Sequence, residues 1–335
     1  MSFNTIGDIA QSLMLRRQGS FLRTELNSLT QELSSGITQD LPAQLRGNFT
    51  SISGVEHSLT LQDGFELNRK MLEPFIDVAQ LSLGTVQRTV DGFGANLLAS
   101  IDSADPVRIE ALVSQGSDML SDIVSLVNTS QAGRFIFAGD SFDRPPISGA
   151  DQIVTELTAA VSGATDAADF TAAVDSYFAA PAGGYFTSIY QGGDPVTQAV
   201  DVSSAYSISY EVTAQDEAIV NVIRESAIIA LVDQGMFSNN QAARDEILQN
   251  TGSALLQTNQ ELISVQADLG RSQERIADAV VQLDLERQMF EEIRNEIITV
   301  DLFEVATELE AVQTQLESLY LITARTSRLS LSEYL

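Results

Sequence analysis

The feature that most constrains this chain is a run of apolar residues whose spacing alternates between four and three. This alternation repeats every seven residues and places every member along one stripe of an α-helix. Such a stripe is stable in water only when another helix covers it. Pro74 lies near the start of the run, where we expect it to begin or kink the helix. The run consists of Leu72, Ile76, Ala79, Leu83, Val86, Val90, Phe93 and Leu97.

The beginning of the chain carries a leucine-rich stripe with similar spacing. Gly19 occupies one of its positions, and Ser34-Ser35-Gly36 follows it. Because glycine readily adopts the left-handed conformation that ends helices, this triplet is expected to stop an N-terminal helix near residue 36. The stripe consists of Leu15, Leu22, Leu26, Leu29 and Leu33.

The C-terminal part carries two stripes whose phases differ by one residue. The first covers residues 262–300 and the second covers 298–326. A slip of one residue rotates an apolar stripe by about 100° around the helix axis. We therefore predict that residues 298–302 separate two helical layers. The second stripe includes Leu302, Val305, Leu309, Val312, Leu316 and Leu319.

The middle of the chain has a different pattern. Asp105-Pro106 is typical of a helix N-cap and first turn, and it opens a third helix that continues to Val127. From about 145 to 214 the content of Gly, Pro, Ser, Thr and aromatic residues increases. Apolar and polar residues alternate over 206–213, and this period of two predicts a half-buried strand. Residues 166–178 and 217–232 show helical patterns again.

Together these patterns predict a mainly α-helical fold. We expect an elongated helical bundle or coiled coil built from paired N- and C-terminal segments, with a small β-containing insertion domain that faces outward. The expected segments are an assembly helix 1–36 pairing with 300–335, a rod 37–147 pairing with 215–299, and the insertion 148–214.

The composition argues against several classes of partner. The formal net charge is −28, with 46 acidic residues against 18 Lys and Arg, and Lys70 is the only lysine. Scattered cations of this number do not favour nucleic acid or an anionic membrane surface. No run of about 18 apolar residues predicts a membrane span. The first residues lack a basic segment, so we expect either a cytoplasmic protein or export without a cleavable signal.

Catalysis and metal binding have little support in the sequence. Cysteine is absent, and His57 is the only histidine, which we expect to be solvated or packed. Gly139-Asp140-Ser141 resembles the nucleophile box of some serine hydrolases. A serine nucleophile needs a base, yet the only histidine lies upstream and no Asp-x-x-His follows. We therefore expect no enzyme, no cofactor and no metal.

The stretch from Gly133 to Pro146 is instead interpreted as a joint between the helical rod and the insertion. Gly133 is expected to end the third helix, after which apolar residues start an extended segment. Two prolines then keep the chain extended as it leaves. The residues assigned to this joint are Gly133, Phe135, Phe137, Gly139, Pro145 and Pro146.

The terminal stripes predict self-association. Neither terminal helix can bury its stripe alone, and the last stripe is nearly all Leu and Val. We expect other copies of the chain to cover it, so that the ends become ordered on assembly. An intramolecular coiled coil that needs no partner is the alternative. The assigned interface is Leu22, Leu26, Leu29, Leu33, Leu302, Val305, Leu309, Val312, Leu316 and Leu319.

Three stretches together resemble the flagellin-like axial proteins of bacterial flagella. "TELNSLTQELSSG" at 24–36 looks like the end of the flagellin N-terminal helix. "QAGRFIFAGDSFDRPPI" at 131–147 is similar to a segment of the hook-associated members, and so is the end of the chain at 300–335, "VDLFEVATELEAVQTQLESLYLITARTSRLSLSEYL".

This resemblance implies a structural protein at the junction between hook and filament, secreted through the flagellar type III system. It implies a ring of copies, with terminal helices in an inner tube and the insertion facing solvent. The implied partners are the chain itself, another hook-associated junction protein, flagellin and an export chaperone. A divergent flagellin of the bulk filament, a Gly-Asp-Ser enzyme and a cytoplasmic coiled-coil scaffold are the alternatives.

Overall fold

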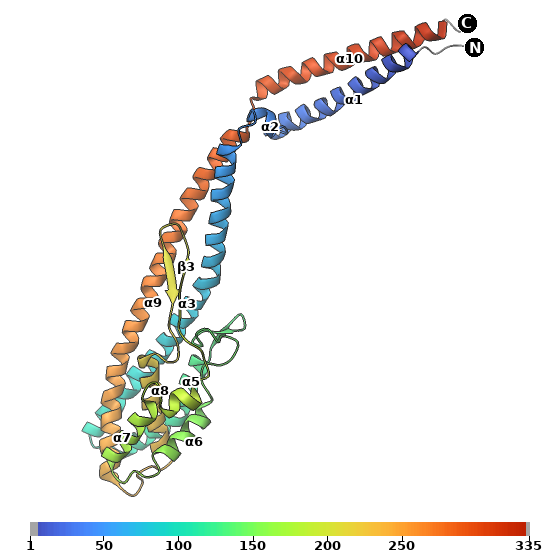
Figure 1. Ribbon diagram of the computed structural model, residues 1–335. Helices are drawn as coiled ribbons and strands as arrows, with labels where there is room; N and C mark the ends of the chain where they lie inside the picture. Colours follow the sequence, from blue (N-terminus) through green and yellow to red (C-terminus); the bar gives the residue numbers. More distant parts are fainter. Residues whose placement is uncertain (1–5, 333–335) are drawn as a thin grey trace. The chain divides into compact units, whose positions relative to one another are not determined.

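The protein is mainly α-helical, as the sequence predicts (Figure 1). The computed structural model describes the backbone of residues 6–332 and the side chains of residues 10–326. The chain forms two compact units. Unit 1 holds the residues up to Gln62 and those from Asp284 onward, and unit 2 holds Asp63–Leu283. The expected division into five segments stays a prediction.

Unit 1 is built from helices at both ends of the chain. Helix α1 (Ile6–Ser35) runs antiparallel to α10 (Leu302–Ser332), and the two lie side by side (Figure 1). The short α2 (Leu41–Gln44) is capped by the side chain of Asp40. Two longer helices, α3 (Thr50–Asp102) and α9 (Gln241–Ile298), contribute to both units.

Two sequence signals mark the helix ends in unit 1 as expected. Helix α1 ends at Ser35, and Gly36 follows with a φ of +72°, the left-handed conformation that favours glycine. Helix α9 ends at Ile298 and α10 begins at Leu302, so the phase slip at 298–302 does separate two helices.

The stripe from Leu72 to Leu97 is buried in unit 2, where α3 packs along α9. Leu72 is partly buried, and the exposed fraction of the other seven side chains is 8% or less. Pro74 does not begin the helix, because α3 starts at Thr50 and continues through it. The opposing stripe of α9 is buried at Leu262, Leu269, Ile276, Ala279 and Leu283.

The predicted third helix is divided in two. Asp105 caps α4 (Pro106–Val113) through its side chain, as expected, but a separate α5 (Gly116–Val127) follows. The break lies where α5 approaches α8 (Glu217–Asp233), because a Cβ at Gly116 would lie 2.5 Å from the Cγ2 of Ile229. Helix α8 is almost entirely buried, so it forms the centre of unit 2.

The insertion contains more helix than strand. It holds α6 (Ala150–Ala160), α7 (Ala167–Phe178) and a π-helical turn at Tyr185–Ile189. Helix α7 confirms the pattern at 166–178. The predicted strand is β4 (Ser207–Tyr210), which pairs antiparallel with β3 (Val196–Asp201). A second small hairpin joins β1 (Ser130–Gln131) to β2 (Arg134–Phe135).

Candidate assembly interface

The paired stripes of α1 and α10 cover one another within the chain. Each buried side chain of this seam has an exposed fraction of 7% or less. The intramolecular coiled coil, which the sequence left open as an alternative, is therefore what the structure shows. The buried members are Leu22, Leu29, Val305, Val312 and Leu319, with Leu15, Leu26, Val300, Leu309 and Leu316 packed against them.

Two of the residues assigned to the interface lie outside this seam. Leu33 and Leu302 are exposed, with exposed fractions of 36% and 50%. Gly19, by contrast, occupies the seam, because a Cβ at that position would lie 3.2 Å from the Cδ2 of Leu319. The assignment of the ten residues to contacts between copies stays a prediction.

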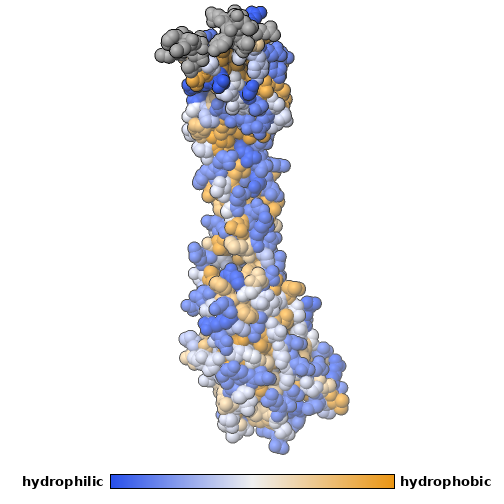
Figure 2. Space-filling model, turned by 90° about the vertical axis from the view of Figure 1, so that its right-hand side faces the viewer, coloured by the Kyte–Doolittle hydropathy of each residue, from blue (hydrophilic) through white to orange (hydrophobic). Residues whose placement is uncertain are grey.

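Hydrophobic side chains also lie on the outside of the α1–α10 pair, and Figure 2 shows them on its surface. Helix α10 exposes apolar side chains in its first turn and again at residues 320–322. These surfaces are not used by the intramolecular seam, so they are the free apolar area of the pair. They comprise Leu13, Met14, Phe21 and Leu33 of α1 and Leu302, Phe303, Tyr320, Leu321 and Ile322 of α10.

A polar contact fixes the two helices beside this free area. The guanidinium of Arg23 donates two hydrogen bonds to the Tyr320 hydroxyl, from Nε at 3.0 Å and from a terminal nitrogen at 2.8 Å. The same guanidinium lies 5.7 Å from the centre of the Tyr320 ring. The hydroxyl and the ring of Tyr320 thus both hold Arg23, although Tyr320 itself stays exposed.

The chain crosses itself where α1 and α9 end. The Val300 amide donates to the Gly36 carbonyl at 3.1 Å, and the Thr38 amide donates to the Ile298 carbonyl at 2.9 Å. The Gln44 side-chain amide donates to the carbonyls of Ile297 and Thr299, at 2.8 and 3.0 Å. Gln44 therefore satisfies carbonyls that the end of α9 leaves without intrahelical partners. No sequence pattern singled out this residue.

The stretch 133–146 is part of the packed body of unit 2. Gly133 does not end the third helix, which stops at Val127. It forms the turn of the β1–β2 hairpin together with Ala132, and both have positive φ. Phe137 is fully buried and Pro146 is buried, while Phe135 is partly buried and Pro145 is exposed. The role of these residues as a joint to the insertion stays a prediction.

Gly139 is required by a close approach of backbone segments. It has a φ of +62°, and a Cβ there would lie 2.4 Å from the carbonyl oxygen of Asp194. The Asp140 amide donates to that same carbonyl at 3.0 Å. The Ser141 hydroxyl donates to the Asp140 carboxylate at 3.2 Å. The Gly-Asp-Ser tripeptide thus acts as a turn that holds residues 193–194.

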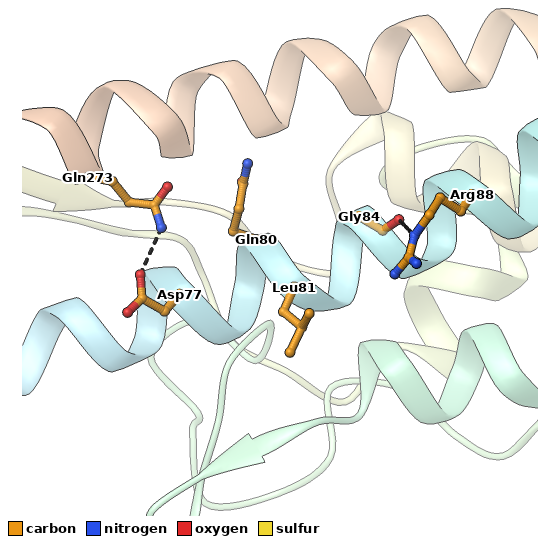
Figure 3. Close-up of a pocket in the computed structure, with 6 residues that line it drawn as sticks. All are labelled: Asp77, Gln80, Leu81, Gly84, Arg88 and Gln273. Atoms are coloured by element: carbon orange, nitrogen blue, oxygen red, sulfur yellow. Dashed lines mark hydrogen bonds between the residues drawn. The ribbon is translucent and has the colours of Figure 1, made fainter.

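An open pocket of about 350 Å³ lies along α3 and α9. Figure 3 shows the residues that line it. The Gln273 side-chain amide donates to Asp77 at 2.7 Å, and the buried Oε1 of Gln80 has no partner among the described residues. Leu81 points away from α9 and is exposed. The Asp77 carboxylate at this pocket is thus held by a side-chain amide of α9.

The described residues offer neither a metal site nor a membrane-spanning helix. Among the side chains of residues 10–326, no group of three or more His, Asp or Glu residues is arranged to hold a metal ion. None of the helices described is both long and apolar enough to cross a membrane. His57 lies exposed on α3.

The chain is similar to flagellar proteins in sequence at one end and in fold over most of its length. Residues 248–335 match the family model of the bacterial flagellin C-terminal helical region. The fold is similar to that of Bacillus cereus FlgL, with a TM-score of 0.51 and 14% identity, covering 72% of this chain and 100% of that one.

A second solved structure gives the same result. A protein of Vibrio parahaemolyticus, described as a flagellar hook-associated protein, matches with a TM-score of 0.52 and 15% identity, covering 75% of this chain and 99% of that one. No similar sequence is found among curated proteins. The resemblance to flagellin-like proteins is thus confirmed in the C-terminal helical region and in the fold.

Proposed function

We propose that this chain is a structural protein of the bacterial flagellum and forms the junction between hook and filament, the role of hook-associated protein 3. One observation carries the proposal. The chain reproduces the fold of two flagellar proteins over essentially their whole length, and its C-terminal region is of the flagellin type. The protein then acts by assembly and not as an enzyme, and its place is outside the cell, on the flagellum.

The geometry of the terminal helices supports a role in assembly. The α1–α10 pair buries one apolar seam and still presents Leu13, Phe21, Phe303 and Leu321 to solvent. Exposed apolar area of this kind marks a surface that other protein chains cover. We propose that copies of the chain pack through these outer faces into a ring, while the buried seam keeps each helical pair together.

The partners follow from this position. A junction protein contacts another hook-associated junction protein on the hook side and flagellin on the filament side. Before export, a chaperone covers the apolar terminal helices. The support for these three partners is the fold and the exposed apolar side chains of α1 and α10.

A divergent flagellin that forms the bulk filament is the second candidate. The observation that favours it is the family model itself, which describes the flagellin C-terminal region. Immunogold labelling of intact flagella separates the two. The junction role predicts label at a single point near the cell-proximal end of the filament, and quantitative mass spectrometry of sheared flagella should find the chain as a trace component. Label along the whole filament would overturn the junction role and support the flagellin.

A further inference from the structure

Unit 2 contains a small cavity that lies apart from the α1–α10 seam and from the contacts between residues 36–44 and 297–300. It lies where α3, residues 134–142 and the β3–β4 hairpin meet, and its volume is about 190 Å³. Its walls are largely apolar, with a few polar groups among them. They include Phe75 of α3, Arg134 of β2, Phe142 of the following loop, and Gln198 and Tyr210 of the hairpin.

One buried polar group at this cavity has no hydrogen-bond partner among the described residues, and an exposed cation lies beside it. The hydroxyl of Tyr210 is buried and makes no hydrogen bond to any described residue. The guanidinium of Arg134 lies 4.0 Å from the ring centre of Phe142 and 5.1 Å from that of Phe75. No carboxylate within the described part of the chain pairs with it. Because a buried hydroxyl without a partner is unfavourable, the cavity suits an occupant that brings an acidic acceptor.

The size of the cavity points to a single side chain. Drug-sized ligands and cofactors occupy pockets of roughly 300–1,000 Å³, which is more than this site offers. A volume of 190 Å³ equals about six water molecules at roughly 30 Å³ each. One aromatic ring fits that space. Aromatic side chains inserted into such pockets are the usual anchors of protein–protein contacts.

The chain itself carries a matching side chain. Among the large apolar residues that the structure describes, Phe303 has the highest exposed fraction, 82%. Glu304 follows it, and the Glu304 carboxylate makes no hydrogen bond or ion pair within the described part of the chain. Val107 is next, with an exposed fraction of 79%, but Arg108 follows it, and that cation would meet the cation of Arg134.

We propose that this cavity receives Phe303 of a second copy, with Glu304 of that copy facing Arg134 and the Tyr210 hydroxyl. The contact joins a cavity in unit 2 of one copy to a side chain in unit 1 of another. When the second copy in turn receives Phe303 of a third, the contact is heterologous and passes from copy to copy. Heterologous contacts are those that close rings or extend helical arrays. The inference rests on the self-assembly proposed above and names one contact within it.

The absence of cysteine makes the contact directly testable. A full-length variant with Gln198→Cys is mixed with one carrying Leu302→Cys, and a short thiol-specific cross-linker is added. Only a contact between copies can join them. We expect a cross-linked dimer at concentrations where sedimentation shows association. The matched control replaces Gln198→Cys by Val107→Cys, which is exposed but does not line the cavity, and should give little product.

Removal of the ring provides the second arm. Phe303→Ala in the Leu302→Cys variant should raise the apparent dissociation constant of self-association by about 30-fold, as for loss of an interface anchor. Tyr210→Phe removes only the hydroxyl and should raise it by about threefold to tenfold. Since Phe303 is exposed, its loss should leave the circular dichroism spectrum unchanged.

Equal cross-linking in the Gln198 and Val107 mixtures, or unchanged association of Phe303→Ala, would overturn the inference. So would a chain that stays monomeric at every concentration up to the millimolar range. If immunogold labels the hook–filament junction and one of these negative results is also obtained, the cavity contact is refuted while the proposed function stands. Absence of the chain from flagella would refute the proposed function instead.

Discussion

The seam between α1 and α10 can be broken by one substitution, Val312→Asp. Val312 has an exposed fraction of 6% and lies in the middle of the seam. Burial of such a side chain stabilises by about 1.5–3 kcal/mol. An unpaired carboxylate in the same place adds a penalty of several kcal/mol. The five buried side chains of the seam together contribute roughly 8–15 kcal/mol before ordering entropy is subtracted. The variant therefore removes a third or more of the seam's stabilisation.

The matched control is Gln313→Asp, which introduces the same charge one residue later at an exposed position. Hydrogen exchange followed by mass spectrometry should show rapid exchange throughout α1 and α10 in Val312→Asp, with unit 2 unchanged because it has its own core. The control should exchange like the parent. In cells, we expect Val312→Asp to abolish swimming and Gln313→Asp to retain it. Protection and swimming that are alike in both variants would refute the view that this seam holds the terminal helices together.

Three further outcomes are expected from contacts elsewhere. Gly116→Ala brings a Cβ against the backbone of α8 and should destabilise the protein by about 1–3 kcal/mol. At Gly92 an added Cβ meets no atom within 4 Å, so Gly92→Ala should stabilise the protein by up to about 1 kcal/mol. Thermal unfolding should therefore show the midpoint temperature lowered in the first variant and raised in the second. Gln44→Leu removes two hydrogen bonds to the end of α9 and should speed amide exchange at Thr38. Unaltered exchange at Thr38 would show that the Gln44 side chain does not hold the two segments together. Burial raises the pKa of Glu225 above its ordinary 4.5, so the folded state binds the carboxyl proton more tightly than the unfolded state does. The free energy of unfolding should therefore fall as the pH rises through the raised pKa. Thermal unfolding at several pH values should show a weaker pH dependence in Glu225→Gln.

Local signals in the sequence were sufficient for much of the helical framework. The stripe from Leu72 to Leu97 predicted a buried helix because the heptad spacing itself requires a covering partner. Gly36 and Asp105 predicted helix ends correctly, since capping depends on residues a few positions apart. The phase slip at 298–302 predicted a break because a stripe that rotates by about 100° cannot face one partner.

The sequence did not predict features that depend on long-range approach. Gly133 has the residue type of a helix end, but it lies in a hairpin turn because α5 had already stopped at Val127. The third helix divides before Gly116, where α5 closely approaches Ile229, a residue more than a hundred positions later in the chain. Pro74 remains inside α3, where packing against α9 outweighs the lost backbone hydrogen bond.

The candidate interface shows the same division. The sequence by itself determined that the terminal stripes must be covered, since leucine and valine at heptad positions are unfavourable in water. It did not determine what covers them, because an intramolecular partner and a second copy satisfy the same periodicity. Only the tertiary structure decided that Leu22 and Val312 pack within one chain. It also decided that Phe303 stays exposed and that the Tyr210 hydroxyl has no hydrogen-bond partner among the described residues, because burial depends on which segments meet in space.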